Sequence, residues 1–146
     1  MRLTGLPVPL DLPPDPVRLT ADSSTGWPCR RCLQDAEVGE VVILVRYDPW
    51  TIDSPYRQPG PIFVHERPCD PWFGTDLPAQ QTSRLLSVRV IDHDGQQVAG
   101  DVVAGTALAT RLEDAFADDR TAFVHLHNAG PGCFAARVDR DDPATR

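Results

Sequence analysis

Apolar and polar residues alternate most clearly near the C-terminal end of the chain, in a stretch that includes His125 and His127. A period of two is typical of a β-strand with two different faces, so both histidines are predicted to lie on the same face. The turn-forming sequence Asn-Ala-Gly-Pro-Gly follows at 128–132. A second apolar run then begins at Cys133. We therefore predict a hairpin over 121–140, the closing hairpin, in which Cys133 returns close to His127.

Other strand patterns occur earlier in the chain. The apolar run at 41–47 is typical of a strand that is buried on both faces. Alternation over 84–92 and a return run at 97–103 flank an Asp-Gly pair, which is the strongest short-range signal for a hairpin. Shorter strands are predicted at 17–20, at the edge of a sheet, and at 61–66.

One stretch has the period of an amphipathic helix. Leu108, Leu112 and Phe116 fall on one apolar stripe. We expect Thr106 to cap the start of this helix. The acidic pair at 118–119 is expected to end it.

Together these elements predict an α+β fold. It consists of a mainly antiparallel sheet of about six strands with one principal helix, in a single domain. A length of 146 residues suits one domain with its own core. Residues 1–26 are predicted to form an extended N-terminal arm, 27–140 the domain, and 141–146 a frayed C-terminal tail.

The charge balance excludes some classes of partner. The net charge is −7 and the isoelectric point is near 4.9, so a nucleic acid is not expected. No stretch has the length and hydrophobicity of a membrane span, so no membrane partner is expected. The default compartment is the cytoplasm, where the four cysteines should be reduced thiols or metal ligands. All fourteen basic residues are arginine, which suggests a high-GC bacterial genome.

One possible set of metal ligands begins at the first pair of cysteines. Cys29 and Cys32 have the Cys-x2-Cys spacing that directs two thiolates at one zinc ion. His65 and Cys69 would complete a set of four. Against this set, the turn lacks the glycine that usually opens a zinc knuckle.

A second set would use the closing hairpin. His125 and His127 share a strand face, and Cys29, Cys133 or a carboxylate would complete the coordination. For both sets of residues, the favoured alternative is that they are core or surface residues with ordinary hydrogen bonds and bind no metal. No residue is therefore assigned as a metal ligand, and the cofactor is left open.

Cys133 is also a candidate nucleophile. It follows a glycine-containing turn, and His127 and Asn128 precede that turn. A neighbouring imidazole lowers the pKa of a thiol and accepts its proton, and the free N–H groups of the turn would hold an oxyanion. The favoured alternative is that Cys133 is a small buried residue that opens a strand.

A further possibility is an anion site built from arginines. Four of them lie in or beside predicted strands, namely Arg57, Arg84, Arg89 and Arg137. A lone charge there is costly unless it is paired, and guanidinium groups match carboxylate or phosphate. Either these arginines bind a small anion, or they pair within the chain with Asp35, Glu37, Asp53 or Asp139.

Several blocks of sequence resemble a known bacterial family. They are Pro-Cys-Arg at 28–30, Leu-Gln-Asp-Ala-Glu-Val-Gly-Glu at 33–40, Ser-Pro-Tyr-Arg at 54–57, Gly-Pro-Ile-Phe-Val at 60–64, Arg-Leu-Leu-Ser-Val-Arg at 84–89, and the unit at 125–140. Over about 27–140 the chain resembles the domain of unknown function 1203. That name implies no activity. The resemblance implies that the Ser-Pro-Tyr-Arg block and the closing unit are typical family features.

The leading hypothesis is a site for a small molecule or anion at the closing hairpin, whether or not it catalyses a reaction. Catalytic roles fall to His127, Cys133 and Asn128. Ligand-binding roles fall to His125, Arg137, Cys29, Tyr56, Arg57 and Arg89. The alternatives are a non-catalytic protein-interaction module and a zinc-binding domain with cysteine and histidine ligands.

Overall fold

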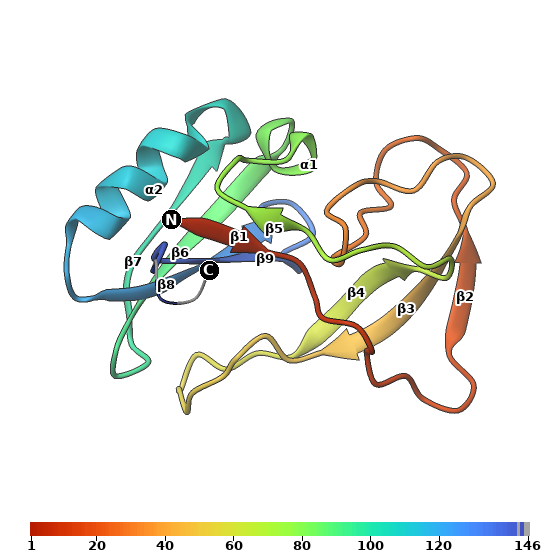
Figure 1. The fold of residues 1–146 in the computed structure, drawn as a ribbon, viewed down its shortest axis with the longest axis horizontal. Helices are drawn as coiled ribbons and strands as arrows, with labels where there is room; N and C mark the ends of the chain where they lie inside the picture. Colours follow the sequence, from red (N-terminus) through yellow and green to blue (C-terminus); the bar gives the residue numbers. More distant parts are fainter. Residues whose placement is uncertain (143, 145–146) are drawn as a thin grey trace.

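The computed structural model describes residues 1–142 and 144 and contains two antiparallel sheets. The larger sheet has six strands in the order β5-β1-β9-β8-β6-β7, and the smaller sheet has three in the order β2-β3-β4. Figure 1 shows the principal helix α2 lying across the larger sheet, with the smaller sheet at the other end of the molecule. The predicted six-stranded antiparallel sheet and single main helix are confirmed, and the smaller sheet is an additional feature.

The elements have the following bounds. The larger sheet contains β1 (Arg2–Thr4), β5 (Phe73–Gly74), β6 (Leu85–Asp92), β7 (Gln97–Ala104), β8 (Thr121–Asn128) and β9 (Phe134–Asp139). The smaller sheet contains β2 (Val17–Thr20), β3 (Val41–Tyr47) and β4 (Gly60–His65). The helices are α1 (Ala79–Thr82) and α2 (Leu108–Ala117), and a 3₁₀ turn at Gly105–Ala107 leads into α2.

The closing hairpin forms the middle of the larger sheet. Its first strand, β8, pairs with β9 on one side and β6 on the other. On one face of β8, Val124 and Leu126 pack with Leu112 of α2 in the main core. The other face carries His125 and His127, which are also buried. The prediction that both histidines share a face is confirmed, because their ring centroids lie 6.3 Å apart across the two-residue repeat.

The start of α2 differs from the prediction. Thr106 lies within the 3₁₀ turn, and Ala107 occupies the N-cap position without a side-chain hydrogen bond. The predicted cap is therefore wrong. The helix instead begins where Leu108 becomes fully buried, because packing of an apolar side chain outweighs a cap worth about 1 kcal/mol. The end of the helix at Asp118 is confirmed.

The smaller sheet packs against the turn end of the closing hairpin. Val45, Ile62 and Val64 form one apolar cluster with Phe134 of β9 and with Cys29. Its strands lie within one or two residues of the predicted bounds, and β2 is an edge strand as predicted. Local alternation identifies a strand without identifying its partner, so the division into two sheets was not visible in the sequence.

The N-terminal segment belongs to both sheets. β1 pairs with β9 on one side and β5 on the other, while β2 joins the smaller sheet. Between them, the backbone N–H of Leu6 donates to the carbonyl of Arg30 at 2.9 Å. The predicted extended arm at 1–26 thus contains two strands. Part of the predicted frayed tail at 141–146 lies outside the described residues.

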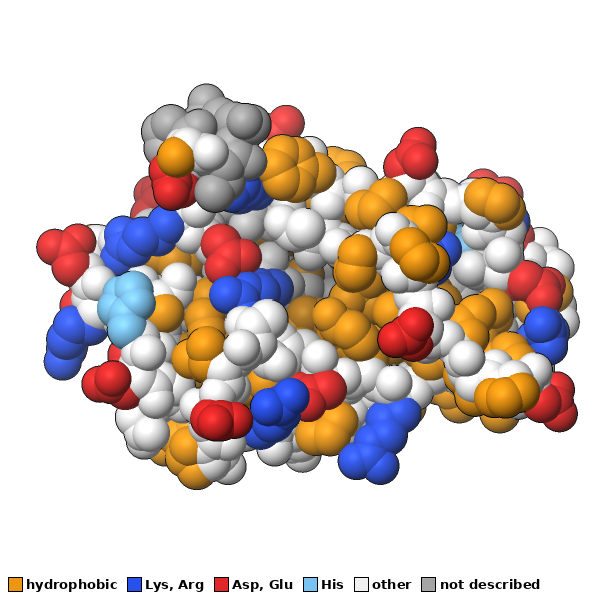
Figure 2. Space-filling model, turned by 60° about the horizontal axis from the view of Figure 1, so that its bottom comes forward, with side chains coloured by type: hydrophobic (Ala, Val, Ile, Leu, Met, Phe, Trp, Pro, Cys, Tyr) orange, Lys and Arg blue, Asp and Glu red, His pale blue; other side chains and the backbone are white. Residues whose placement is uncertain are grey.

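Acidic and basic side chains are interspersed on the surface. Figure 2 shows red and blue side chains mixed across one face, with hydrophobic side chains exposed between them. Within the described part of the chain, no helix is both long enough and apolar enough to span a membrane.

Candidate functional site

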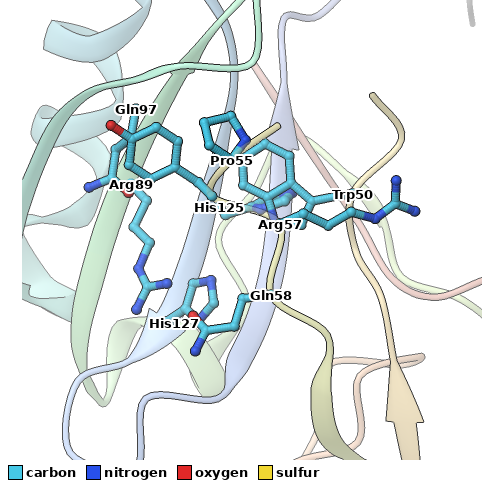
Figure 3. A pocket seen from close by; sticks show the side chains of 9 residues that line it. Trp50, Pro55, Arg57, Gln58, Arg89, Gln97, His125 and His127 are labelled. Carbon is cyan, nitrogen blue, oxygen red and sulfur yellow. The ribbon is translucent and has the colours of Figure 1, made fainter. Parts of the chain in front are cut away.

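A cleft of about 260 Å³ lies over the histidine face of the larger sheet, under the loop that joins β3 to β4. Figure 3 shows the side chains that line it. The strands contribute Arg89, Gln97, His125 and His127, and the loop contributes Trp50, Pro55, Tyr56, Arg57 and Gln58. Five of the predicted site residues therefore meet here, namely His125, His127, Tyr56, Arg57 and Arg89.

Arg89 is the cleft arginine that has no carboxylate partner among the described residues. It lies on β6 directly across from His125, and it is partly buried. Within the described part of the chain, its side chain forms one long hydrogen bond, of 3.5 Å from Nε to Ser87 Oγ. Among residues 1–142 and 144, the ion pairs involve other arginines and His65. Burial lowers the pKa of Arg89, because partial removal from water disfavours the charged guanidinium.

His125 is uncharged at neutral pH. Burial lowers its pKa to about 3, and the positive charges of Arg137, His127 and Arg89 add to the effect. Three aromatic rings surround the imidazole at centroid distances of 4.8–5.3 Å, those of Trp50, Phe123 and Phe134. Its Nε2 atom is buried and has no hydrogen-bond partner among the residues that the structure describes.

His127 is held in one tautomer by the turn that follows it. Its Nδ1 lies 2.9 Å from the carbonyl oxygen of Gly132, and because a carbonyl only accepts, Nδ1 carries the proton. Burial lowers the pKa of His127 to about 4, with the bond to Gly132 opposing the shift. At neutral pH, Nε2 is therefore an unprotonated acceptor. Figure 3 shows the side chains of His127, Arg89 and Gln58 directed toward one another.

Three of the four arginines that the sequence offered for an anion site are already paired within the chain, and the first of them, Arg84, donates to the Asp35 carboxylate at 2.5 Å. Arg57 donates from Nε to Asp48 at 2.6 Å, and its guanidinium points away from the other cleft residues in Figure 3. Arg137 forms a bidentate pair with Asp139 at 2.9–3.1 Å. It also stacks 3.9 Å above the Phe123 ring. Arg137 does not line the cleft, and the internal pairing weighed in the sequence accounts for its charge.

The remaining residues of the predicted catalytic group lie beside the cleft. Cys133 and His127 both line a neighbouring hollow of about 220 Å³. The Cys133 sulfur accepts from Arg30 at 3.1 Å and from the Asn128 amide at 3.4 Å. His127 Nδ1 is bonded to the Gly132 carbonyl and not to the thiol. The donors to the Cys133 sulfur are Arg30 and Asn128. Catalysis by Cys133 stays a prediction.

Cys29 lies in a different place, which we call the Cys-His cluster. Its members are Cys29, Cys32, His65 and Cys69, and their ligand atoms all lie within 4.8 Å of one another. The sulfurs of Cys29 and Cys69 are 3.9 Å apart, and the Cys32 sulfur is 3.4 Å from His65 Nδ1. The cluster is compatible with a zinc site.

The chain matches a known protein family over nearly the same residues as the predicted domain at 27–140. A family model described as Protein of unknown function (DUF1203) matches residues 26–140, most of the sequence. The chain belongs to the DUF1203 family. Searches of curated proteins and of solved structures each found no match. Membership confirms the resemblance and assigns no reaction to this DUF1203 protein.

In this DUF1203 chain the sequence offered these four residues as one possible zinc set, and the missing glycine was the argument against them. Leu33 follows the second cysteine and adopts a φ of 53°, the left-handed conformation that glycine usually supplies in such turns. Its side chain is buried in the main core, which offsets the backbone cost. The spacing Cys-x2-Cys followed by His-x3-Cys was the signal that pointed to all four residues.

The thiols of the cluster share hydrogen bonds. The Cys32 thiol donates to the Cys29 sulfur and lowers the pKa of Cys29 to about 4, with backbone N–H groups of the same turn and of His65 adding to the effect. The same hydrogen bond raises the pKa of Cys32. Negative charge at the Cys29 sulfur is thus favoured in this environment.

Proposed function

We propose that this DUF1203 protein binds a small anionic molecule in the cleft between the β3–β4 loop and the closing hairpin. The observation that carries the proposal is Arg89, a partly buried guanidinium without a carboxylate partner among the described residues. Burying an unpaired charge is costly. A bound anion would supply the missing counter-ion, and a guanidinium fork is well suited to a carboxylate or phosphate.

The other walls of the cleft support a polar ligand of limited size. A volume of about 260 Å³ lies just below the range of about 300–1,000 Å³ that is typical of drug-sized ligands. Tyr56 is exposed at the mouth, and the amides of Gln58 and Gln97 supply further hydrogen-bonding groups. These features favour a molecule with one or two acidic groups and a short carbon skeleton.

The protonation of His127 narrows the ligand further. Its Nε2 is an acceptor at neutral pH, so it pairs with a ligand hydroxyl and not with a second anionic oxygen. Three of the blocks that carry the family resemblance meet at this cleft, through Tyr56, Arg89 and the histidines. We therefore propose a hydroxyl-bearing acid, either a hydroxycarboxylate or a hydrogen phosphate, as the ligand class.

Isothermal titration calorimetry in a phosphate-free buffer tests the proposal with malate, succinate and inorganic phosphate. Malate and succinate differ by one hydroxyl. Malate should bind about five-fold more tightly, since one hydrogen bond contributes about 1 kcal/mol. The substitution Arg89→Gln should weaken malate binding by at least about ten-fold, because it removes a charge-assisted bond.

The control is Arg120→Gln, which removes the same charge from an exposed arginine that pairs with Asp118. If affinity depended only on net charge, both variants would lose the same amount. Equal losses, or no binding of any of the three anions by the wild-type protein, would refute an Arg89-centred site. The hydroxyl preference should also disappear in His127→Phe.

A further inference from the structure

We propose that Cys29, Cys32, His65 and Cys69 bind one zinc ion in a closed, structural site. This site is separate from the cleft, and it stands or falls independently of the anion ligand. Three thiolates and one imidazole form a soft ligand set that suits zinc in tetrahedral coordination. The remaining cysteine among the described residues, Cys133, bonds to Arg30 and Asn128 instead.

Two of the ligand-atom distances are close to the edges of a zinc tetrahedron, and the others are at most 4.8 Å. With Zn–S bonds of about 2.3 Å and Zn–N bonds of about 2.0 Å, two sulfurs lie about 3.8 Å apart and a sulfur and a nitrogen about 3.5 Å apart. The cluster has 3.9 Å between the Cys29 and Cys69 sulfurs and 3.4 Å between the Cys32 sulfur and His65 Nδ1. These spacings would accommodate the ion with little movement of the chain.

The backbone around Cys29 has the form of a zinc knuckle. Leu33 turns the chain through the left-handed region directly after Cys32. The Cys29 N–H donates to the carbonyl of Gln34 at 3.0 Å and closes the turn. The N–H of His65 donates to the Cys29 sulfur at 3.3 Å, the kind of bond that stabilises a metal-bound thiolate.

The histidine is oriented by a second residue. His65 is fully buried, its Nδ1 faces the sulfur of Cys32, and its Nε2 lies 3.7 Å from the Glu40 carboxylate. Glu40 is itself held by the Arg67 side chain and the Glu37 backbone N–H. A carboxylate behind the far nitrogen of a histidine is the usual outer partner of a zinc-bound imidazole. Among residues 1–142 and 144, Nε2 has no hydrogen-bond partner, and a small closure onto Glu40 would supply one.

The position of the cluster indicates a structural role. Four protein ligands fill a tetrahedral site and leave no position for substrate. The ligands come from the knuckle at 29–32, the end of β4 and the following loop. The carbonyls of Arg30 and Arg31 in the knuckle accept from Leu6 and Trp72 beside the larger sheet. A bound ion would thus tie the smaller sheet to the segments that lead into the larger one.

The test is the metal content of untagged protein purified under reducing conditions, measured by elemental mass spectrometry. About one zinc per chain is expected. Cys32→Ser and Cys69→Ser should each lose the metal, whereas the matched control Cys133→Ser should keep it. Chelation should lower the melting temperature of the wild-type protein, and added zinc should restore it, since a ligand of the folded state stabilises that state.

A second measurement covers ligand variants that fail to fold. Titration of cobalt(II) into wild-type protein stripped of metal should give the intense visible bands of a tetrahedral thiolate site, and Cys133→Ser should give the same bands. Three results would overturn the proposal. They are a metal-free wild type that does not take up zinc or cobalt, a Cys69→Ser variant that retains full metal content, and a disulfide between cluster cysteines that persists under reducing conditions.

Discussion

Gly5 occupies the tightest backbone contact between the N-terminal segment and the knuckle at 29–32. A Cβ atom there would lie 1.8 Å from the carbonyl oxygen of Arg31 and 2.9 Å from the backbone nitrogen of Trp72. The Gly5 N–H also donates to the Trp72 carbonyl at 2.8 Å. Only a residue without a side chain allows the N-terminal segment to approach the knuckle and the Trp72 backbone so closely.

The substitution Gly5→Ala should therefore destabilise the protein by about 1–3 kcal/mol, the usual cost of forcing extra volume into a packed site. Denaturant unfolding measures this as a lower midpoint. The control is Gly130→Ala, because a Cβ at Gly130 would meet no heavy atom within 4 Å. Midpoints that are lowered equally in the two variants would show that the close approach does not determine the effect.

The sequence predicted the position or partner of a residue correctly where residues close to it in the chain determine that position or partner. The shared face of His125 and His127 follows from strand period and was correct. The charge partner of Arg137 proved to be Asp139, two residues away, which the sequence had offered as one of several choices. Whether Arg89 has a carboxylate partner depends on which side chains from other strands and loops lie next to it. No local sequence pattern contains that information.

The strand β8 places two uncharged imidazoles in the middle of the larger sheet, and this makes stability depend on pH. The folded-state pKa values of His125 and His127 are about 3 and about 4, below the ordinary value of about 6.5. Between these values the unfolded chain binds protons that the folded chain does not. The free energy of unfolding should therefore fall as the pH is lowered from about 6.5 to about 4.

The variant His125→Phe should flatten this dependence. Each buried histidine contributes at most about 1.4 kcal/mol per pH unit to the slope, and the phenylalanine ring fits an aromatic surrounding without titrating. Denaturant unfolding at several pH values measures the slope for both proteins. Since both carry the Cys-His cluster, effects of metal loss cancel in the difference. Parallel curves would mean that His125 is protonated in the folded protein.

At the scale of elements, the sequence predicted most strands and the main helix. The runs at 41–47 and 97–103 and the Asp-Gly hairpin before the latter were recovered almost residue for residue. The strand β1 was missed because three residues give too short a pattern for alternation to be recognised. The short β5 and α1 were missed for the same reason.

At the scale of the whole molecule, two sites occupy two different positions. The cleft lies on the histidine face of the larger sheet, and the Cys-His cluster lies at the end of β4 beside the smaller sheet. The sequence grouped Cys29 with the cleft because it had no means of separating the two sheets. In the structure, Cys29 lies next to Cys32 of its own turn and next to His65 and Cys69, away from the cleft.

The division has a functional consequence. If the Cys-His cluster binds zinc as proposed, the ion would help to hold the smaller sheet and its β3–β4 loop, and that loop covers the proposed anion cleft. Removing the metal should therefore affect the cleft only indirectly, through the position of that loop. Binding of the anion itself rests on Arg89 and His127.

Side-chain ¹⁵N–¹H NMR of the histidines and of Arg89, recorded during addition of malate, tests whether the cleft binds an anion. We expect saturable shifts at the Arg89 Nε–H and at the His127 ring nitrogens, with Nδ1 of His127 protonated at neutral pH, and no shift at His65. Saturable shifts at exposed arginines such as Arg120 instead, or an absence of any saturable shift, would contradict an anion site in this cleft.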